Sequence, residues 1–146
     1  MKPAPRDADK TPGFSWTVRI YYEDTDAGGI VYYANYLKFF ERARTEWLRS
    51  LGIGLQALTQ SQRIAFVVKS IAVEYHAPAR LDDELNLTVA VERLGRASVH
   101  LIQEAWRVSD GEQCLLASGR IRLACVESLE LRPSPIPEDV LKKIDP

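Results

Sequence analysis

The chain has 146 residues, of which 46% are hydrophobic and 27% charged, and its formal net charge is −1, all of which is typical of one globular domain. This charge gives no general attraction to nucleic acid or to an anionic membrane, and no uncharged apolar run approaches the roughly 20 residues of a transmembrane helix. We therefore expect no nucleic-acid partner and no transmembrane segment, and the opening MKPAPRDADKTPGF, which lacks the apolar core of a signal peptide, favours a cytoplasmic protein.

Residues 1–29 are predicted to form a tail, a strand and an acidic loop. Residues 1–14 are rich in proline and charge without periodicity, which predicts a flexible tail. The stretch SWTVRIYY (15–22) is β-branched and aromatic, as is typical of a strand. It leads into EDTDAGG (23–29), which a surface turn alone would explain. The apolar and aromatic IVYYANY that follows indicates instead that this loop packs against a core.

A long amphipathic helix is predicted next. Apolar residues recur at spacings of three and four between Tyr36 and Leu51, which predicts one buried helical face over about 16 to 18 residues. Gly52 follows as a typical stop signal. Asn35 is a candidate N-cap, although Tyr33 could already lie in the first turn.

The sequence after residue 62 is predicted to form mainly β-strands. RIAFVVKSIAVEYHAP (63–78) is expected to be a long, bent strand, because its apolar residues do not keep one parity. LDDELNLTVAVERL, SVHLIQEAWRV and QCLLASGRIRLACVE follow one another through short turn signals, which predicts an antiparallel meander. The proline-rich 129–146 is expected to be a surface extension with a short helical turn. The whole predicts an α+β domain in which an antiparallel sheet carries one helix across one face.

Two stretches carry a family resemblance: YYEDTDAGGIVYYANYLKFFERARTEWLRSLG and, some forty residues later, YHAPARLDDEL. Together with the order of elements over 15–128, they resemble the hotdog-fold acyl-CoA thioesterases. Within that fold they are most similar to the branch of 4-hydroxybenzoyl-CoA thioesterase and the Tol-Pal-associated acyl-CoA thioesterases. The resemblance implies a hotdog domain at 15–128, with a five-stranded antiparallel sheet wrapped around one long central helix. It also implies homodimers, often paired into homotetramers, with active sites at the dimer interface.

The resemblance also implies which residues form the site. The catalytic carboxylate of the family falls on Asp26, and the backbone N–H that polarises the thioester carbonyl falls on Tyr33. Many Tol-Pal-associated members have histidine where this chain has Tyr33, and a backbone role survives that change. The other expected substrate-binding residues are Gly28, Gly29, Ile30, Val31 and Asn35, with Arg93 and Arg96 as candidates for the phosphates of CoA.

These residue types suit thioester hydrolysis. The reaction needs a nucleophile or a base that delivers water, and a donor that stabilises the developing oxyanion. Asp26 could attack the carbonyl or activate water, and the sequence does not separate these roles. Glycines at 28 and 29 let a substrate approach the backbone, and the unpaired N–H groups at a helix start favour negative charge. CoA enters as part of the substrate, and we expect no metal or redox cofactor.

Other acids and the histidines have competing interpretations. Glu41 is the rival catalytic acid, because another branch of hotdog thioesterases uses an acid on the helix. Asp24 is expected to order the loop. DTDAGG is similar to the start of a calcium loop, but position twelve is Asn35 where a bidentate glutamate belongs, so we expect no calcium. His76 and His100 are expected to be hydrogen-bonded structural residues.

Two other functions remain open at this stage. Hydrolysis of an acyl group carried on acyl carrier protein would use the same pantetheine arm. A noncatalytic hotdog module would bind acyl-CoA or a partner protein, and the intact Asp26 with its glycines argues against it. The sequence leaves open the length and type of the acyl group and the choice between dimer and tetramer.

Overall fold

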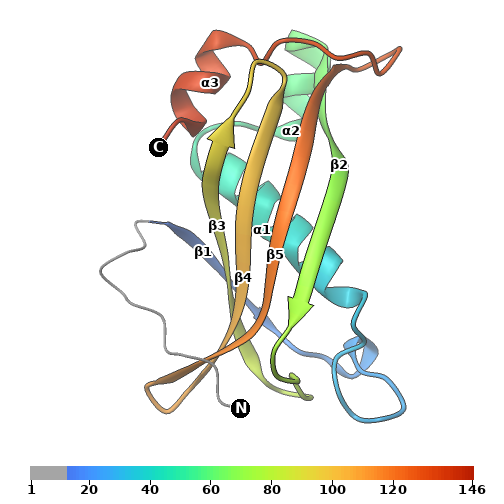
Figure 1. The fold of residues 1–146 in the computed structure, drawn as a ribbon, viewed down its shortest axis with the longest axis vertical. Helices are drawn as coiled ribbons and strands as arrows, with labels where there is room; N and C mark the ends of the chain where they lie inside the picture. Colours follow the sequence, from blue (N-terminus) through green and yellow to red (C-terminus); the bar gives the residue numbers. More distant parts are fainter. Residues whose placement is uncertain (1–12) are drawn as a thin grey trace.

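The computed structural model describes residues 13–146, so the predicted tail lies almost wholly outside the described residues. Figure 1 shows one sheet that faces the longest helix. The strands of the sheet are β1 (Phe14–Arg19), β2 (Ile64–Tyr75), β3 (Glu84–Leu94), β4 (Ser98–Ser109) and β5 (Glu112–Glu127). All neighbours are antiparallel in the order β1-β3-β4-β5-β2. The predicted meander is confirmed, since β3, β4 and β5 are consecutive in the sheet.

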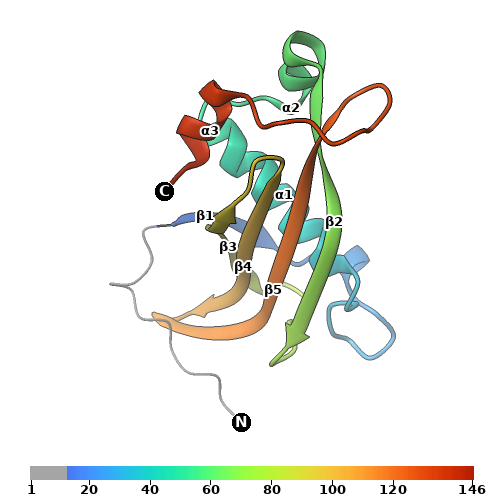
Figure 2. The ribbon, with the colours of Figure 1, turned by 45° about the horizontal axis from the view of Figure 1, so that its top comes forward.

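The longest helix lies against one face of this sheet. The 16-residue α1 (Asn35–Ser50) has the predicted buried stripe, which includes Phe39, Phe40 and Trp47. The sheet curves around α1 in Figure 2. At Gly119 in β5 a Cβ atom would lie 3.2 Å from the Phe40 ring, so the missing side chain allows helix and sheet to pack closely.

Shorter helical segments complete the chain. They are α2 (Leu55–Ala57), α3 (Glu138–Ile144), a 3₁₀ turn at Tyr22–Asp24 and a π turn at Leu58–Gln62. No helix within residues 13–146 is long and apolar enough to span a membrane.

Two segments differ from the sequence expectation. The first strand ends at Arg19 and not at 22, because Tyr22–Asp24 form a 3₁₀ turn in which the Asp24 carboxylate accepts a hydrogen bond from the Tyr21 N–H at 2.8 Å. The segment 129–146 was expected on the surface, but three of its apolar side chains belong to the core cluster: Ile136, Val140 and Ile144. Its prolines prevent regular structure before α3 without preventing this docking.

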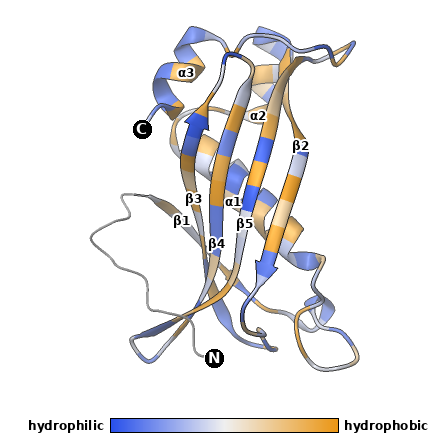
Figure 3. Ribbon diagram, in the orientation of Figure 1, coloured by the Kyte–Doolittle hydropathy of each residue, from blue (hydrophilic) through white to orange (hydrophobic). Residues whose placement is uncertain are grey.

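Strand β2 forms one edge of the sheet. It pairs with β5 alone, and a register shift between Val68 and Ser70 confirms the predicted irregularity. Several of its apolar side chains are exposed, including Val67 at 37% and Val68 at 49%. Figure 3 shows this apolar run along β2. An exposed apolar edge strand presents unpaired backbone groups that can pair with another chain.

Candidate functional site

The acidic loop between β1 and α1 is closed by its own backbone. The Asp26 N–H donates to the Ile30 carbonyl at 2.8 Å, and the Gly29 N–H donates to the Asp26 carbonyl at 3.0 Å. Thr25 and Val31 form an isolated antiparallel bridge at the base. The loop is therefore an ordered turn whose tip carries Asp26 and the two glycines.

This loop is also fixed to the body of the protein. The Val31 N–H donates to the Ala79 carbonyl at 2.8 Å, and Ile30 forms a bridge with Arg80. Val31 is 4% exposed and belongs to the core cluster. The expectation that the loop packs against a core is confirmed.

The Asp26 side chain is exposed and only partly engaged. Its Oδ1 accepts a hydrogen bond from the Gly28 N–H at 2.8 Å. Among residues 13–146, no donor reaches Oδ2. One oxygen thus orients the carboxylate while the other can meet a ligand.

Gly29 has φ +79°, a conformation that residues with a Cβ rarely adopt. No atom lies within 4 Å of a Cβ built there, so the effect of an added methyl group is conformational strain. We expect Gly29→Ala to lower the free energy of unfolding by about 1 to 2 kcal/mol, measured by urea denaturation. Gly111→Ala, at φ +78° in the distant β4–β5 turn, is the matched control. Gly111→Ala should lose a similar amount of stability and keep its activity. If Gly29→Ala were as stable as the wild type, the backbone at position 29 would have moved out of the positive-φ region at no cost, contrary to this expectation.

The start of α1 contacts this loop directly. Ala34 is the N-cap and no side chain caps the helix, so the capping interpretation of Asn35 is wrong. The Asn35 Nδ2 instead donates to the Asp24 carbonyl at 2.9 Å, and the Tyr32 N–H donates to the same oxygen at 2.9 Å. Both bonds fix the first turn of α1 beside the loop.

Tyr33 precedes the helix with an open backbone donor. In the part of the chain that the structure describes, its N–H donates no hydrogen bond. Its carbonyl accepts one from the Tyr75 hydroxyl at 2.8 Å. Tyr75 therefore holds the Tyr33–Ala34 peptide, which follows the peptide of the open N–H, from the side of β2.

Three tyrosines form a cluster at this point. The Tyr75 ring lies edge-on to Tyr33 and Tyr36, with centroid distances of 6.2 and 5.5 Å. Burial, and then the nearby Tyr75, raise the pKa of Tyr36 to about 12, so its phenol is neutral at physiological pH. Reasoning from the sequence did not assign Tyr75 to the site, although it lies in the motif stretch YHAPARLDDEL.

A cavity of about 390 Å³ opens beside this cluster. Its volume is within the range of about 300 to 1,000 Å³ that is usual for small-molecule sites. His76 is hydrogen-bonded to Ser118 Oγ at 2.9 Å, as expected of a structural histidine. The cavity is lined by Ile30, Val31, Tyr33, Tyr36, Tyr75, His76, Ala77 and Pro78.

Tyr75→Phe removes the hydroxyl that holds the Tyr33 carbonyl and leaves the ring in place. Because one hydrogen bond is lost, we expect the free energy of unfolding to fall by about 0.5 to 1.5 kcal/mol. If the Tyr33 N–H takes part in the reaction, loss of the bond to the adjacent Tyr33–Ala34 peptide should let that N–H shift, and kcat should fall several-fold at nearly unchanged KM. Steady-state kinetics and urea denaturation measure the two effects. Unchanged kcat together with lowered stability would mean that the bond is only structural.

Arg93 and Arg96 lie away from this group of residues within one chain. The loop contacts Ala79 and Arg80, just before β3 begins at Glu84, whereas Arg93 is near the far end of β3. Arg93 lies nine positions after Glu84 along the strand, which is roughly 30 Å at about 3.3 Å per residue. Their role in binding CoA stays a prediction. It requires either a substrate that extends across the sheet or arginines that a second copy of the chain supplies.

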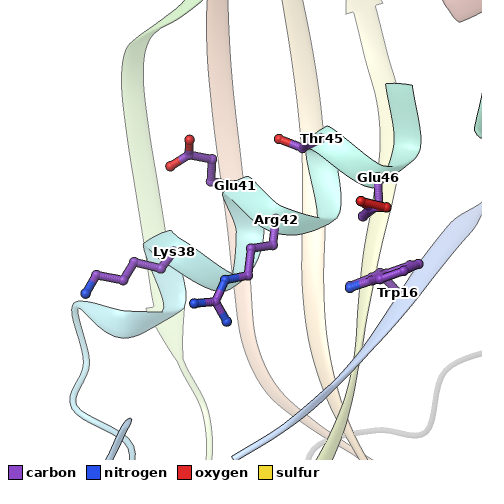
Figure 4. A pocket seen from close by; sticks show the side chains of 6 residues that line it. All are labelled: Trp16, Lys38, Glu41, Arg42, Thr45 and Glu46. Carbon is purple, nitrogen blue, oxygen red and sulfur yellow. The ribbon is translucent and has the colours of Figure 1, made fainter. Parts of the chain in front are cut away.

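The rival acid Glu41 lies on the exposed side of α1. Figure 4 shows a cavity of about 480 Å³ lined by six residues: Trp16, Lys38, Glu41, Arg42, Thr45 and Glu46. In this view Lys38 and Arg42 extend to one side of α1, whereas Glu41 and Thr45 extend to the other. Glu41 is thus not among the residues that the loop and Tyr33 bring together.

Metal-ligating side chains do not gather within residues 13–146. No group of three or more histidine, cysteine, aspartate or glutamate side chains in this part of the chain is placed to hold a metal ion. The expectation of a reaction without a cofactor stays a prediction.

Comparison with known proteins shows similarity to thioesterases over most of the chain. The model of the thioesterase-like superfamily matches residues 20–144. The acyl-CoA thioester hydrolase YbgC of Escherichia coli O6:H1 is 44% identical over 128 residues, which cover 88% of this chain and 92% of that protein. The acyl-CoA thioesterase YbgC of Haemophilus influenzae is also 44% identical, with coverage of 88% and 91%.

A solved structure extends the comparison to the fold. A mutant of 4-hydroxybenzoyl-CoA thioesterase in complex with 4-hydroxybenzoyl-CoA superposes with a TM-score of 0.86. The match covers 92% of this chain and 100% of that chain at 18% identity, so it shows the shared fold alone.

Proposed function

Because this chain belongs to the thioesterase-like superfamily, we propose that it hydrolyses the thioester of an acyl-CoA to a free acid and CoA. The observation that carries the site is a pair of open groups, one in the acidic loop and one just before α1. The first is the free oxygen of Asp26 and the second is the free N–H of Tyr33. Tyr33 lines the apolar cavity, as do Ile30 and Val31, which follow the glycines of the loop. An attacking group and an oxyanion donor are the two parts that acyl transfer to water requires.

Asp26 supplies the attacking group in this proposal. Its carboxylate adds to the thioester carbonyl to give a mixed anhydride, or it removes a proton from a water molecule that adds instead. In either case the C–S bond breaks and the thiolate of CoA leaves. The hydrogen bond from the Gly28 N–H holds the carboxylate, and the absence of side chains at Gly28 and Gly29 lets a thioester approach it.

Tyr33 supplies the oxyanion donor. Its N–H precedes the first turn of α1, where the unpaired N–H groups and the positive end of the helix dipole favour negative charge. Tyr75 and Asn35 fix this turn from two sides, through the Tyr33 carbonyl and the Asp24 carbonyl. Such preorganised donors lower the barrier because they need no rearrangement as the charge develops.

The apolar cavity beside Tyr33 is the proposed entrance for the acyl group. Its aromatic walls suit both aliphatic and aryl chains, so the acyl class stays open. Arg93 and Arg96 remain proposed contacts for the phosphates of CoA. Acyl carrier protein remains an alternative carrier of the same acyl group.

We infer further that the enzyme works as a homodimer, or a dimer of such dimers, formed through β2. The support is the unpaired edge of β2 with its exposed apolar side chains, among them Val67, Val68 and Tyr75. Pairing of two copies along this edge would bury these side chains and enclose the neighbouring cavity. The proposed unit is the hotdog domain at 15–128 with α1 as its central helix, acting in the cytoplasm.

Mass spectrometry in H₂¹⁸O tests hydrolysis itself. The purified chain is incubated with a mixture of short-chain, long-chain and hydroxybenzoyl-type acyl-CoA thioesters. Hydrolysis predicts free CoA and a carboxylic acid that carries one ¹⁸O atom. Release of CoA without labelled acid would indicate acyl transfer to another acceptor and would overturn the proposal.

A further inference from the structure

The loop after β5, residues 128–132, exposes two large apolar side chains. Leu129 is 81% exposed and Leu131 is 60% exposed. Single exposed leucines are common on protein surfaces, whereas neighbouring ones on one ordered loop indicate an interaction surface. The pair is therefore a candidate contact for another molecule.

This loop is held in one conformation by Glu127. Its two carboxylate oxygens accept hydrogen bonds from the N–H groups of Leu129 and Glu130, at 2.7 and 2.8 Å. The Glu130 and Leu129 N–H groups hold the pKa of the Glu127 carboxyl below its ordinary value, so it is ionised and keeps these bonds at neutral pH. The Leu131 N–H donates to the Glu127 carbonyl at 2.9 Å. The two leucines are thus presented on an ordered turn, as binding groups should be.

Leu131 has a backbone conformation that suits glycine. Its φ is +59°, in the left-handed region that residues with a Cβ rarely adopt. A glycine would take this conformation without strain. Backbone strain of this kind is concentrated at positions with a function, which favours a role for the exposed side chain.

The loop lies at the opposite end of β2 from the proposed site. Ile64, the first residue of β2, pairs with Glu127, from which the loop starts. Tyr75, the last residue of β2, donates to the Tyr33 carbonyl, so the start of α1 lies at the other end. In Figures 1 and 2 the orange-red loop after β5 and the blue loop before α1 both project past the β2 edge. Each is therefore on the side where a second copy would pair.

Two-fold pairing along β2 exchanges these two ends. Identical edges related by a two-fold axis run antiparallel, so the start of one strand lies opposite the end of the other. Where the 12 residues of β2 overlap in full, Ile64 faces the partner's Tyr75. The loop of each copy then meets the cavity end of the other copy. Tyr33 and Tyr75, which are 62% and 46% exposed in the single chain, offer it an apolar surface there.

We propose that Leu129 and Leu131 of each copy pack against Tyr33 and Tyr75 of the partner subunit and close the mouth of its apolar cavity. Leucine side chains on tyrosine rings bury apolar area on both sides of the contact. Each cavity thereby receives part of its wall from the other copy, and a long acyl chain contacts the leucines at the mouth. This inference rests on the proposed dimer through β2 and on the proposed acyl site.

Photocrosslinking tests the contact without relying on activity. p-Benzoylphenylalanine replaces Leu131, and ¹⁵N-labelled and unlabelled copies are refolded together, so that mass spectrometry identifies crosslinks between copies. We expect such crosslinks to peptides that contain Tyr33 or Tyr75. The same replacement at Glu112, at the β4–β5 turn, is the control and should give none to these peptides.

Two outcomes of this experiment overturn the proposal in different ways. Crosslinks between copies that avoid these peptides, in a protein that is a dimer by light scattering, overturn this contact and leave the dimer. A monomeric wild-type protein overturns the contact and the proposed dimer together.

Leu131→Gly removes the side chain and the backbone strain together, so the single chain should stay folded. Because the two-fold axis makes each leucine contact occur twice, the dissociation constant of the dimer should rise about tenfold or more. Analytical ultracentrifugation measures it. Asp110→Gly, at φ +49° in the β4–β5 turn, is the matched control and should leave it unchanged. An unchanged dissociation constant in Leu131→Gly overturns the proposal.

Kinetics test the closing of the cavity, at protein concentrations where the variant is still dimeric. The ratio of kcat/KM for decanoyl-CoA to that for acetyl-CoA should fall about threefold or more in Leu131→Gly, because only the longer chain extends to the mouth. An unchanged ratio overturns the role of the loop in the cavity. Hydrolysis of neither thioester counts against the proposed function, while the crosslinking still decides the contact.

Discussion

Asp26→Asn is expected to lower kcat/KM for acyl-CoA hydrolysis by about 10³-fold or more, because an amide neither attacks a thioester nor removes a proton from water. The substitution keeps the size of the side chain and an oxygen that can accept the hydrogen bond from the Gly28 N–H. The loop should therefore keep its structure. Spectroscopic measurement of CoA release, with the oligomer checked by gel filtration, gives the comparison with the wild-type protein.

Two other carboxylates provide matched controls for Asp26. Asp24→Asn lies in the same loop, where its side chain accepts a hydrogen bond from the Tyr21 N–H, and it should keep most of the activity. Glu41→Gln tests the rival acid on α1 and should also remain active. Full activity in Asp26→Asn, or a large loss in Glu41→Gln alone, would move the catalytic assignment to the helix.

Val68→Asp should convert the protein to a monomer and lower kcat/KM by about 10²-fold, since small displacements of reacting groups cost that much. Val68 is 49% exposed on the edge strand β2, and a carboxylate there would lose its water on pairing with a second copy. The site is proposed to be complete only in the dimer. Light scattering gives the mass, and CoA release gives the activity.

Ser15→Asp is the control for the other edge of the sheet. Ser15 is exposed on β1, which pairs with β3 alone, and the substitution should change neither mass nor activity. A monomeric and fully active Val68→Asp would contradict an interfacial site. An unchanged oligomer in that variant would show that β2 is not the interface.

The fold was predictable where the signal is local. The sequence SDGE and the alternation of Leu85, Leu87 and Val89 predicted consecutive antiparallel strands, which β3, β4 and β5 confirm. The apolar spacing from Tyr36 to Leu51 predicted α1 within one or two residues. In both cases neighbouring residues determine the pattern, so no distant contact is needed.

Features that depend on distant contacts were not predictable. The bond from Tyr75 to the Tyr33 carbonyl joins residues 42 positions apart, and the bond from Arg44 to Gln103 joins residues 59 apart. Proline content suggested an exposed C-terminal segment, because composition does not show that Ile136 would dock against the core. Asn35 is a residue type that often caps helices, yet its side-chain amide donates a hydrogen bond to the Asp24 carbonyl, which the fold places beside it.

The most direct test of this account is the release of CoA from acyl-CoA thioesters by the purified wild-type protein. The panel contains short-chain, long-chain and hydroxybenzoyl-type thioesters. The account predicts that at least one is hydrolysed with kcat/KM of about 10⁴ M⁻¹s⁻¹ or higher, the lower end of the usual enzymatic range. Release no faster than in buffer from every thioester would contradict it.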